Sequence, residues 1–142
     1  MKNNPIIIEQ LIDAKASDIW KAITNKDELS VWFFEIDDFT PVVGSSFTFY
    51  TGGEEQKYQH ICKILEIRDE RVFSFSWKYS DLPGDSVVTY KLSEHGGKTM
   101  FQLKHEGIGN FPQNDPLFTR QSFLDGWKEL IEISLKEYIE SK

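Results

Sequence analysis

The chain has 142 residues, a length that fits one domain able to bury a substantial core without disulfides or metals. Its formal net charge is −7, and no Lys/Arg cluster of the kind that follows a phosphate backbone is present, so nucleic acids and anionic membrane surfaces are not expected partners. The lone cysteine, Cys62, excludes an intramolecular disulfide and is expected to be a small buried residue.

The sequence carries no recognisable targeting or membrane segment. Its N-terminal stretch lacks the apolar run and cleavage site of a secretory signal, and no stretch has transmembrane length. We therefore expect a cytoplasmic protein without membrane insertion. Because no repeat, low-complexity tract or linker interrupts the sequence, residues 1–142 are expected to form a single domain.

The first part of the chain predicts one strand followed by two short helices. Residues 6–12 are rich in isoleucine, which favours a strand. Ser17 is a suitable N-cap for a helix that ends near residues 24–25, and a second short helix is expected over residues 27–32. Two helices this short cannot form a bundle, so they are expected to brace the first strand against a sheet.

From residue 41 to residue 106 the sequence predicts antiparallel strands joined by short turns. Apolar and polar side chains alternate with a period of two over residues 46–51, 71–79 and 99–106. One face of the 71–79 strand carries four aromatic rings. The strand over residues 60–68 has apolar side chains on both faces, so its inward face stays open.

The last segment, residues 115–140, predicts the only long helix. Asp115 is a suitable N-cap, and Pro116 fits the first helical position. At about 100° per residue, one face of this helix is apolar. Within that face Ser134 replaces a bulky residue and is expected to leave a gap, and Arg120 is expected to project inward, where its charge would need a partner or water.

These elements together predict an α+β fold. A curved antiparallel sheet has one polar face and one aromatic face, and the terminal helix covers the aromatic face. Gly126 lies inside that helix, where glycine costs about 1 kcal/mol relative to alanine. We therefore expect another backbone to approach the helix closely at Gly126, in tight packing.

Several sequence blocks share their order and spacing with a known family. They are residues 12–14 with 19–24, residues 43–49, residues 64–67 with 71–77, residues 99–107, and Gly126-Trp127 with Leu130 and Leu135. This pattern resembles the heat-shock-protein-90 ATPase activator homologue family, within the START-like (SRPBCC) superfamily that includes birch-pollen-allergen-like proteins. Ser45 departs from it, at a place that the family often gives to glycine.

The resemblance implies a helix-grip fold. In that fold a sheet of about seven strands wraps around a long C-terminal helix, with two short helices between the first two strands and an apolar cavity inside. The family supports ligand binding, polyketide cyclisation and co-chaperone activity, so the fold alone does not fix the function.

A cavity between the sheet and the terminal helix is the first candidate site. It would hold a small, largely apolar molecule, such as a lipid, a polyketide or an aromatic metabolite, oriented by tyrosine and histidine side chains. The alternative is that the rings pack on one another and leave no void. The candidate ligand-binding residues are Trp32, Phe34, Phe49, Phe75, Trp77, Tyr79, Tyr90, Phe101, His105, Arg120, Phe123, Trp127 and Ser134.

Two further roles are considered for residues of this set. Arg120 would pair with an anionic group on a ligand, or alternatively with a loop carboxylate such as Asp115, or reach solvent. A cyclase- or hydrolase-type enzyme would need an acid or base facing the cavity, and the candidates are His105 as proton donor and Tyr90 as orienting group.

Metal, cofactor and chaperone functions have weaker support in the sequence. His60 and Cys62 share a strand face, but two ligands do not make a zinc site, and neither a metal nor a cofactor is expected. A role as a chaperone ATPase activator is suggested by the resemblance alone. The acidic surface offers no defined contact stripe for such a partner.

Overall fold

The computed structural model describes residues 5–36, 38–51, 58–112 and 114–142. Strands and helices alternate only at the start of the chain, after which five strands precede the terminal helical segment. The elements are β1 (Ile6–Ile12), α1 (Ala16–Thr24), α2 (Lys26–Trp32), β2 (Ser46–Thr51), β3 (Tyr58–Arg68), β4 (Val72–Tyr79), β5 (Ser86–His95), β6 (Lys98–Glu106), the short 3₁₀ helices η2 (Ile108–Asn110) and η3 (Pro116–Phe118), α3 (Arg120–Lys128), the π-helical η4 (Glu129–Leu135) and α4 (Lys136–Glu140).

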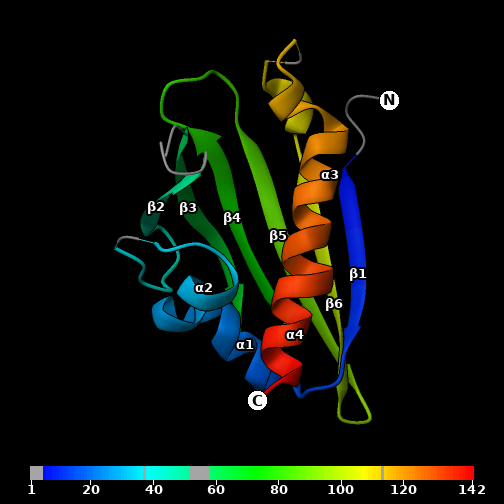
Figure 1. The fold of residues 1–142 in the computed structure, drawn as a ribbon. Coiled ribbons are helices and arrows are strands. Elements are labelled where there is room, and N and C mark those ends of the chain that lie inside the picture. Colours follow the sequence, from blue (N-terminus) through cyan, green and yellow to red (C-terminus); the bar gives the residue numbers. More distant parts are fainter. Residues whose placement is uncertain (1–4, 37, 52–57, 113) are drawn as a thin grey trace.

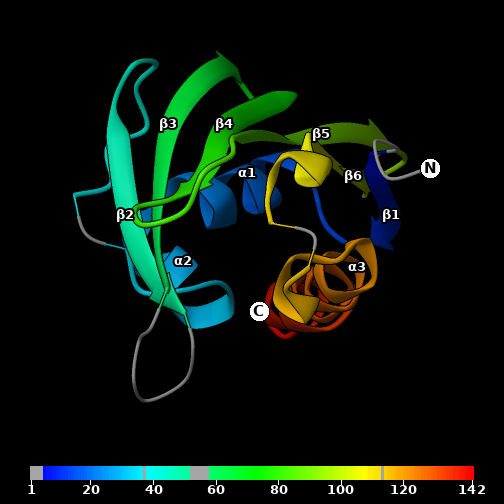
Figure 2. The same cartoon turned by 90° about the horizontal axis from the view of Figure 1, so that it is seen from above.

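The strands form one antiparallel sheet in the order β1-β6-β5-β4-β3-β2 (Figure 1). The sheet curves around the terminal helical segment, with α1 and α2 between β1 and β2 in the sequence (Figure 2). This arrangement confirms the predicted α+β helix-grip fold. The strand count differs slightly, because the described part of the chain contains six strands where the resemblance implies about seven.

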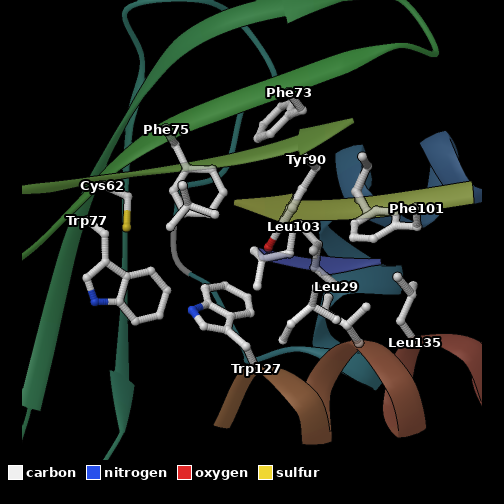
Figure 3. Packing of buried hydrophobic residues seen from close by; sticks show 14 of the residues in the cluster. Leu29, Cys62, Phe73, Phe75, Trp77, Tyr90, Phe101, Leu103, Trp127 and Leu135 are labelled. Carbon is white, nitrogen blue, oxygen red and sulfur yellow. The ribbon is translucent and has the colours of Figure 1, made fainter. Parts of the chain in front are cut away.

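The inner face of the sheet is aromatic, as the period-two pattern predicts. Along β4 the residues Phe73, Phe75, Trp77 and Tyr79 are buried, while Lys78 between them is exposed. Figure 3 shows rings from β4 and β5 meeting Trp127 of α3. Large rings bury much apolar area per residue, so this face contributes a large share of the core.

The inward face of β3, left open by the sequence, is the one carrying His60, Cys62 and Ile64. The register of β3 against β4 shifts between Ile64 and Glu66, and this β-bulge turns Ile67 toward the core. A bulge breaks strict alternation, which explains why apolar side chains stood on both faces of the predicted strand. Cys62 is buried as predicted, and burial raises the pKa of its thiol.

The predicted start of the long helix is wrong by four residues. Asp115 does cap a helical turn by accepting from the backbone N–H of Leu117, but this turn is the 3₁₀ helix η3. The helix α3 begins at Arg120, where the hydroxyl of Thr119 accepts from the backbone N–H of Ser122. The sequence therefore contains two N-caps in succession, and the second one starts the helix.

The terminal helical segment changes its winding at η4, which is a π-helix. The residues buried against the sheet lie four apart, and a strict α-helix would rotate each one about 40° from the last. The wider π turn opposes this drift. As a result the buried row stays in line to its end, and its members are Phe123, Trp127, Ile131, Leu135 and Ile139.

The C-terminal end of this segment is fixed by polar contacts. Near its C-terminus a carboxylate oxygen of Glu140 accepts from the backbone N–H of Asp13 at 2.9 Å. Glu28 of α2 accepts from the hydroxyl of Tyr138 at 3.0 Å and from Nζ of Lys142 at 2.6 Å. Within the described residues, no helix is long and apolar enough to cross a membrane.

The short helix α1 begins without the predicted serine cap. Ser17 lies inside α1, and the position before the helix is Lys15, whose side chain makes no capping hydrogen bond. Instead the carboxylate of Glu94, on β5, accepts from the backbone N–H of Ala16 at 2.7 Å. A contact between residues far apart in the chain thus replaces the local cap.

The middle of the protein is filled by side chains. The interior space between α1, α2 and the sheet amounts to about 10 Å³, which is close to the least volume that holds one water molecule. The cavity expected between the sheet and the terminal helix is therefore not in this part of the interior. Rings such as Phe73, Phe75 and Tyr90 pack there on the short helices, and the larger space lies at one end of the sheet.

Candidate functional site

An apolar pocket of about 220 Å³ opens between the sheet and the start of the terminal helical segment. Strands β2 and β4 form one side, the residues after α2 form the rim, and η3, α3 and η4 form the other side. The lining residues are Phe34, Thr51, Trp77, Tyr79, Leu117, Ser122, Phe123, Gly126, Trp127 and Leu130.

The helical wall of the pocket consists of two rows of residues, each spaced by about one turn. Phe123 and Trp127 form the inner row, which is buried against the sheet. Ser122, Gly126 and Leu130 form the outer row. Because the outer row begins with two small residues, space remains beside the rings of the inner row.

On the sheet side, Tyr79 supplies a polar group to a mostly apolar wall. Its hydroxyl oxygen accepts a hydrogen bond from Nε1 of Trp77 at 3.1 Å, and the hydroxyl hydrogen has no acceptor among the described residues. Burial raises the pKa of Tyr79 to about 12, so the hydroxyl keeps its hydrogen at neutral pH. Tyr79 can therefore donate a hydrogen bond to a guest.

A chain of buried polar groups joins Trp127 to the sheet. Nε1 of Trp127 donates to Nδ1 of His105 at 3.0 Å, and Nε2 of His105 lies 2.8 Å from Oγ of Ser86. The Ser86 hydroxyl donates its only hydrogen to the carbonyl oxygen of Trp77 at 2.7 Å. Nε2 of His105 must then donate to Ser86, which makes the imidazole the neutral Nε2–H tautomer. Burial lowers the pKa of His105 to about 3, in agreement with a neutral ring.

His60 lies behind the pocket, enclosed by aromatic rings. Its ring stacks on Phe49 at 4.4 Å between centroids and contacts Trp77 at 4.8 Å and Tyr79 at 4.6 Å. Burial lowers the pKa of His60 to about 4, and this effect outweighs the interactions with the backbone of Phe49 and of Tyr58, which raise the pKa. Within the described part of the chain, its buried Nδ1 has no hydrogen-bond partner. His60 therefore acts as a neutral ring that supports the pocket wall.

Part of the predicted ligand-binding set meets in this pocket. Its members come from the loop after α2, from β4 and from α3, and they are Phe34, Trp77, Tyr79, Phe123 and Trp127. Trp77 and Trp127 face each other with ring centroids 5.4 Å apart (Figure 3). The aromatic alternation of β4 and the spacing of the helix were enough to bring these residues together.

Other predicted residues lie in the packed interior and do not line the pocket. Phe49 stacks on Phe34 at 5.1 Å and so supports the rim from behind. Trp32 donates from Nε1 to the carbonyl oxygen of Ala22 at 2.9 Å. Phe75 and Phe101 are buried among the core rings (Figure 3).

The candidate catalytic pair, His105 and Tyr90, also lies outside the pocket lining. Both ring nitrogens of His105 are engaged in the chain that holds Trp127. Tyr90 is buried in the core, and burial raises the pKa of its hydroxyl far above the ordinary value. A general acid must reach the reacting group, and neither side chain is placed to do so in this pocket.

The structure places Arg120 in solvent, which was one of the alternatives for it, and places Ser134 outside the pocket lining. Arg120 is exposed, and its guanidinium Nη2 donates to the carbonyl oxygen of Pro5 at 3.2 Å. Ser134 belongs to η4 and lies one turn beyond Leu130, the last helical residue of the pocket.

The reason given for Gly126 is also wrong. A Cβ atom built at Gly126 would have no described atom within 4 Å, so no neighbouring backbone requires a glycine there. Four lining residues were not predicted from the sequence: Thr51, Leu117, Ser122 and Leu130. The available signal was Ser122 and Gly126 four residues apart, beside the buried rings of α3.

Comparisons with known proteins agree with this fold. The family model described as Activator of Hsp90 ATPase homolog 1-like protein matches residues 13–140. MLL2253 from Mesorhizobium loti is 22% identical with a TM-score of 0.79 over 98% of both chains. CV1439 from Chromobacterium violaceum is 20% identical with a TM-score of 0.81 over 99% of both chains.

CalU16 from Micromonospora echinospora is 27% identical, with a TM-score of 0.73 over 95% of this chain and 75% of the other. No curated protein matches the chain. The fold is compatible with ligand binding, as the pocket geometry also is. Because the family model covers nearly all of the sequence, the chain belongs to the family of Activator of Hsp90 ATPase homolog 1-like proteins, within the START-like superfamily.

Proposed function

We propose that this protein binds a small ring compound that carries an oxygen acceptor, such as a carbonyl or a phenol oxygen. The observation that carries the proposal is the pocket of about 220 Å³, whose mostly apolar wall includes Tyr79, a buried residue whose hydroxyl hydrogen has no acceptor among the described residues. Ligand sites commonly combine apolar walls with a few polar groups that fix orientation.

The volume of the pocket limits the size of the guest. Drug-sized ligands occupy pockets of roughly 300–1,000 Å³, and benzene occupies an engineered cavity of about 150 Å³. A pocket of about 220 Å³ therefore matches one aromatic ring or two fused rings. A whole lipid or a four-ring polyketide would extend beyond it into solvent.

The polar groups of the pocket favour a neutral guest with an acceptor. Tyr79 offers a hydrogen, while its oxygen already accepts from Trp77. The one cation that was expected to pair with an anionic ligand, Arg120, lies on the surface and outside the lining. A guest with a carbonyl oxygen thus satisfies the donor without burying an unpaired charge.

A matched pair of probes tests the proposal. The bicyclic ketone 1-indanone and its hydrocarbon analogue indane have nearly the same shape and differ in the acceptor oxygen. In an NMR titration up to millimolar ligand, we expect 1-indanone to shift the indole N–H signals of Trp77 and Trp127 and to bind more tightly than indane. If neither compound shifts those signals, the proposal is wrong.

A further inference from the structure

The geometry of α3 gives Gly126 a role that packing does not explain. Gly126 sits in the interior of the helix, where glycine is less favourable than alanine. Two ordinary reasons for a helical glycine are a left-handed backbone and a close neighbour. Gly126 has helical backbone geometry, and a Cβ atom there would meet no described atom within 4 Å.

The missing side chain lies on the row that borders the pocket. Ser122 is one turn before Gly126, Leu130 is one turn after it, and all three line the pocket. A side chain at position 126 would therefore stand between these two neighbours, in space that is now open. Ser122 is also small, so the only bulky member of this row is Leu130.

We infer that Gly126 sets the breadth of the guest that the pocket accepts. Without a side chain there, the space beside Phe123 and Trp127 extends outward between α3 and the rim at Phe34. This extra breadth admits a second fused ring, whereas a pocket closed at position 126 would admit a single ring. The inference rests on the proposed ligand binding and assigns Gly126 as its specificity-determining residue.

This role predicts opposite effects on stability and on binding. Gly126→Ala removes an unfavourable helical glycine without a clash, so the thermal midpoint should rise by roughly 2–5 °C. Gly126→Leu should also fold, since a Cβ atom there meets no described atom within 4 Å and leucine favours a helix more than glycine does. We expect Gly126→Leu to weaken 1-indanone binding at least tenfold and to change the affinity for the single-ring ketone cyclohexanone by less than threefold.

Lys128→Leu is the matched control, because Lys128 is exposed on the same helix and does not line the pocket. It should leave both affinities unchanged. The inference is overturned if Gly126→Leu binds 1-indanone as tightly as the original chain or more tightly. If the original chain binds neither ketone, the proposed function fails and the inference fails with it. If the original chain binds 1-indanone and Gly126→Leu binds it equally well, only the inference fails.

Discussion

Nε1 of Trp127 donates to Nδ1 of His105 across 3.0 Å, and this hydrogen bond joins the terminal helical segment to the inner strands of the sheet. The acceptor exists only while His105 is neutral, because a protonated imidazole carries a hydrogen on both nitrogens. Protonation would therefore place two N–H groups opposite each other in a buried site. The fold and the pocket wall at Trp127 depend on the charge state of one histidine.

The first prediction concerns acid pH. Burial lowers the pKa of His105 to about 3 and that of His60 to about 4, whereas an unfolded histidine titrates near 6.5. Below pH 6.5 these histidines bind protons in the unfolded chain but stay neutral in the folded chain. The free energy of unfolding therefore decreases as the pH is lowered. Between pH 7 and pH 5 the two residues together should remove about 4 kcal/mol.

Urea denaturation at pH 7, 6 and 5 measures this loss. The variant His60→Phe keeps a ring inside the aromatic enclosure and removes one of the two titrations, so its loss should be about half as large. It should also be as stable as the original chain at pH 7, because the unpaired Nδ1 disappears. A stability that does not change with pH would contradict the role of both histidines.

The second prediction concerns Trp127→Phe. The phenyl ring keeps most of the apolar contact but leaves Nδ1 of His105 as a buried acceptor without a donor. The expected loss is about 1–3 kcal/mol in the free energy of unfolding at pH 7. His95 is an exposed histidine, and His95→Gln should change stability by less than about 0.5 kcal/mol. Equal losses in the two variants would show that the buried bond contributes nothing specific.

The third prediction concerns the donor in the pocket. Tyr79→Phe retains the ring and removes the hydroxyl, so the affinity for 1-indanone should fall about five- to tenfold, the amount expected for one hydrogen bond of roughly 1 kcal/mol. The affinity for indane should stay within about twofold. A parallel NMR titration of both compounds measures the two ratios. The assignment of Tyr79 fails if both compounds weaken equally.

The fourth prediction concerns the contact between α2 and the C-terminal residues. Burial of Glu28 opposes ionisation, but hydrogen bonds from Lys142 and Tyr138 and the charge of Lys21 outweigh it and lower the pKa of its carboxyl group. Glu28→Gln should cost about 1–2 kcal/mol in the free energy of unfolding at pH 7. The matched control is Glu66→Gln, an exposed carboxylate paired with Arg68, which should cost under about 0.5 kcal/mol.

Chemical denaturation of both variants in low salt and in 1 M NaCl separates the two contacts. The cost of Glu28→Gln should persist in high salt, since the carboxylate is largely shielded from solvent. If Glu66→Gln costs as much as Glu28→Gln, burial of the carboxylate does not strengthen the contact.

The strands were predictable because their pattern depends on local alternation. Along β4 every second side chain points to the core, and the sequence shows that period directly. The same reasoning failed on β3, where the bulge near Glu66 adds a residue that only the partner strand reveals. The start of α3 was missed for a related reason, since Asp115 and Thr119 are both competent caps.

The site was only partly predictable because pocket volume depends on which row of a helix a small residue occupies. From the sequence, a gap was expected at a small residue of the terminal helix, Ser134. The gap lies instead at Ser122 and Gly126, since the π-helical η4 changes the rotation of the residues after it. Ile139 completes the buried row, while Tyr138 is only partly buried.

The π-helical η4 also separates two tasks within one segment. A π-helical stretch holds about one residue more than α-helix with the same number of turns, so winding all of Glu129–Leu135 as ordinary α-helix would turn everything after it by about 100°. Ile139 would then no longer pack on the sheet, and the hydroxyl of Tyr138 would lose its hydrogen bond to Glu28. The pocket wall at Phe123 would keep its place. One surplus residue thus allows the beginning of the segment to shape a binding site while its end stays fastened to the rest of the protein.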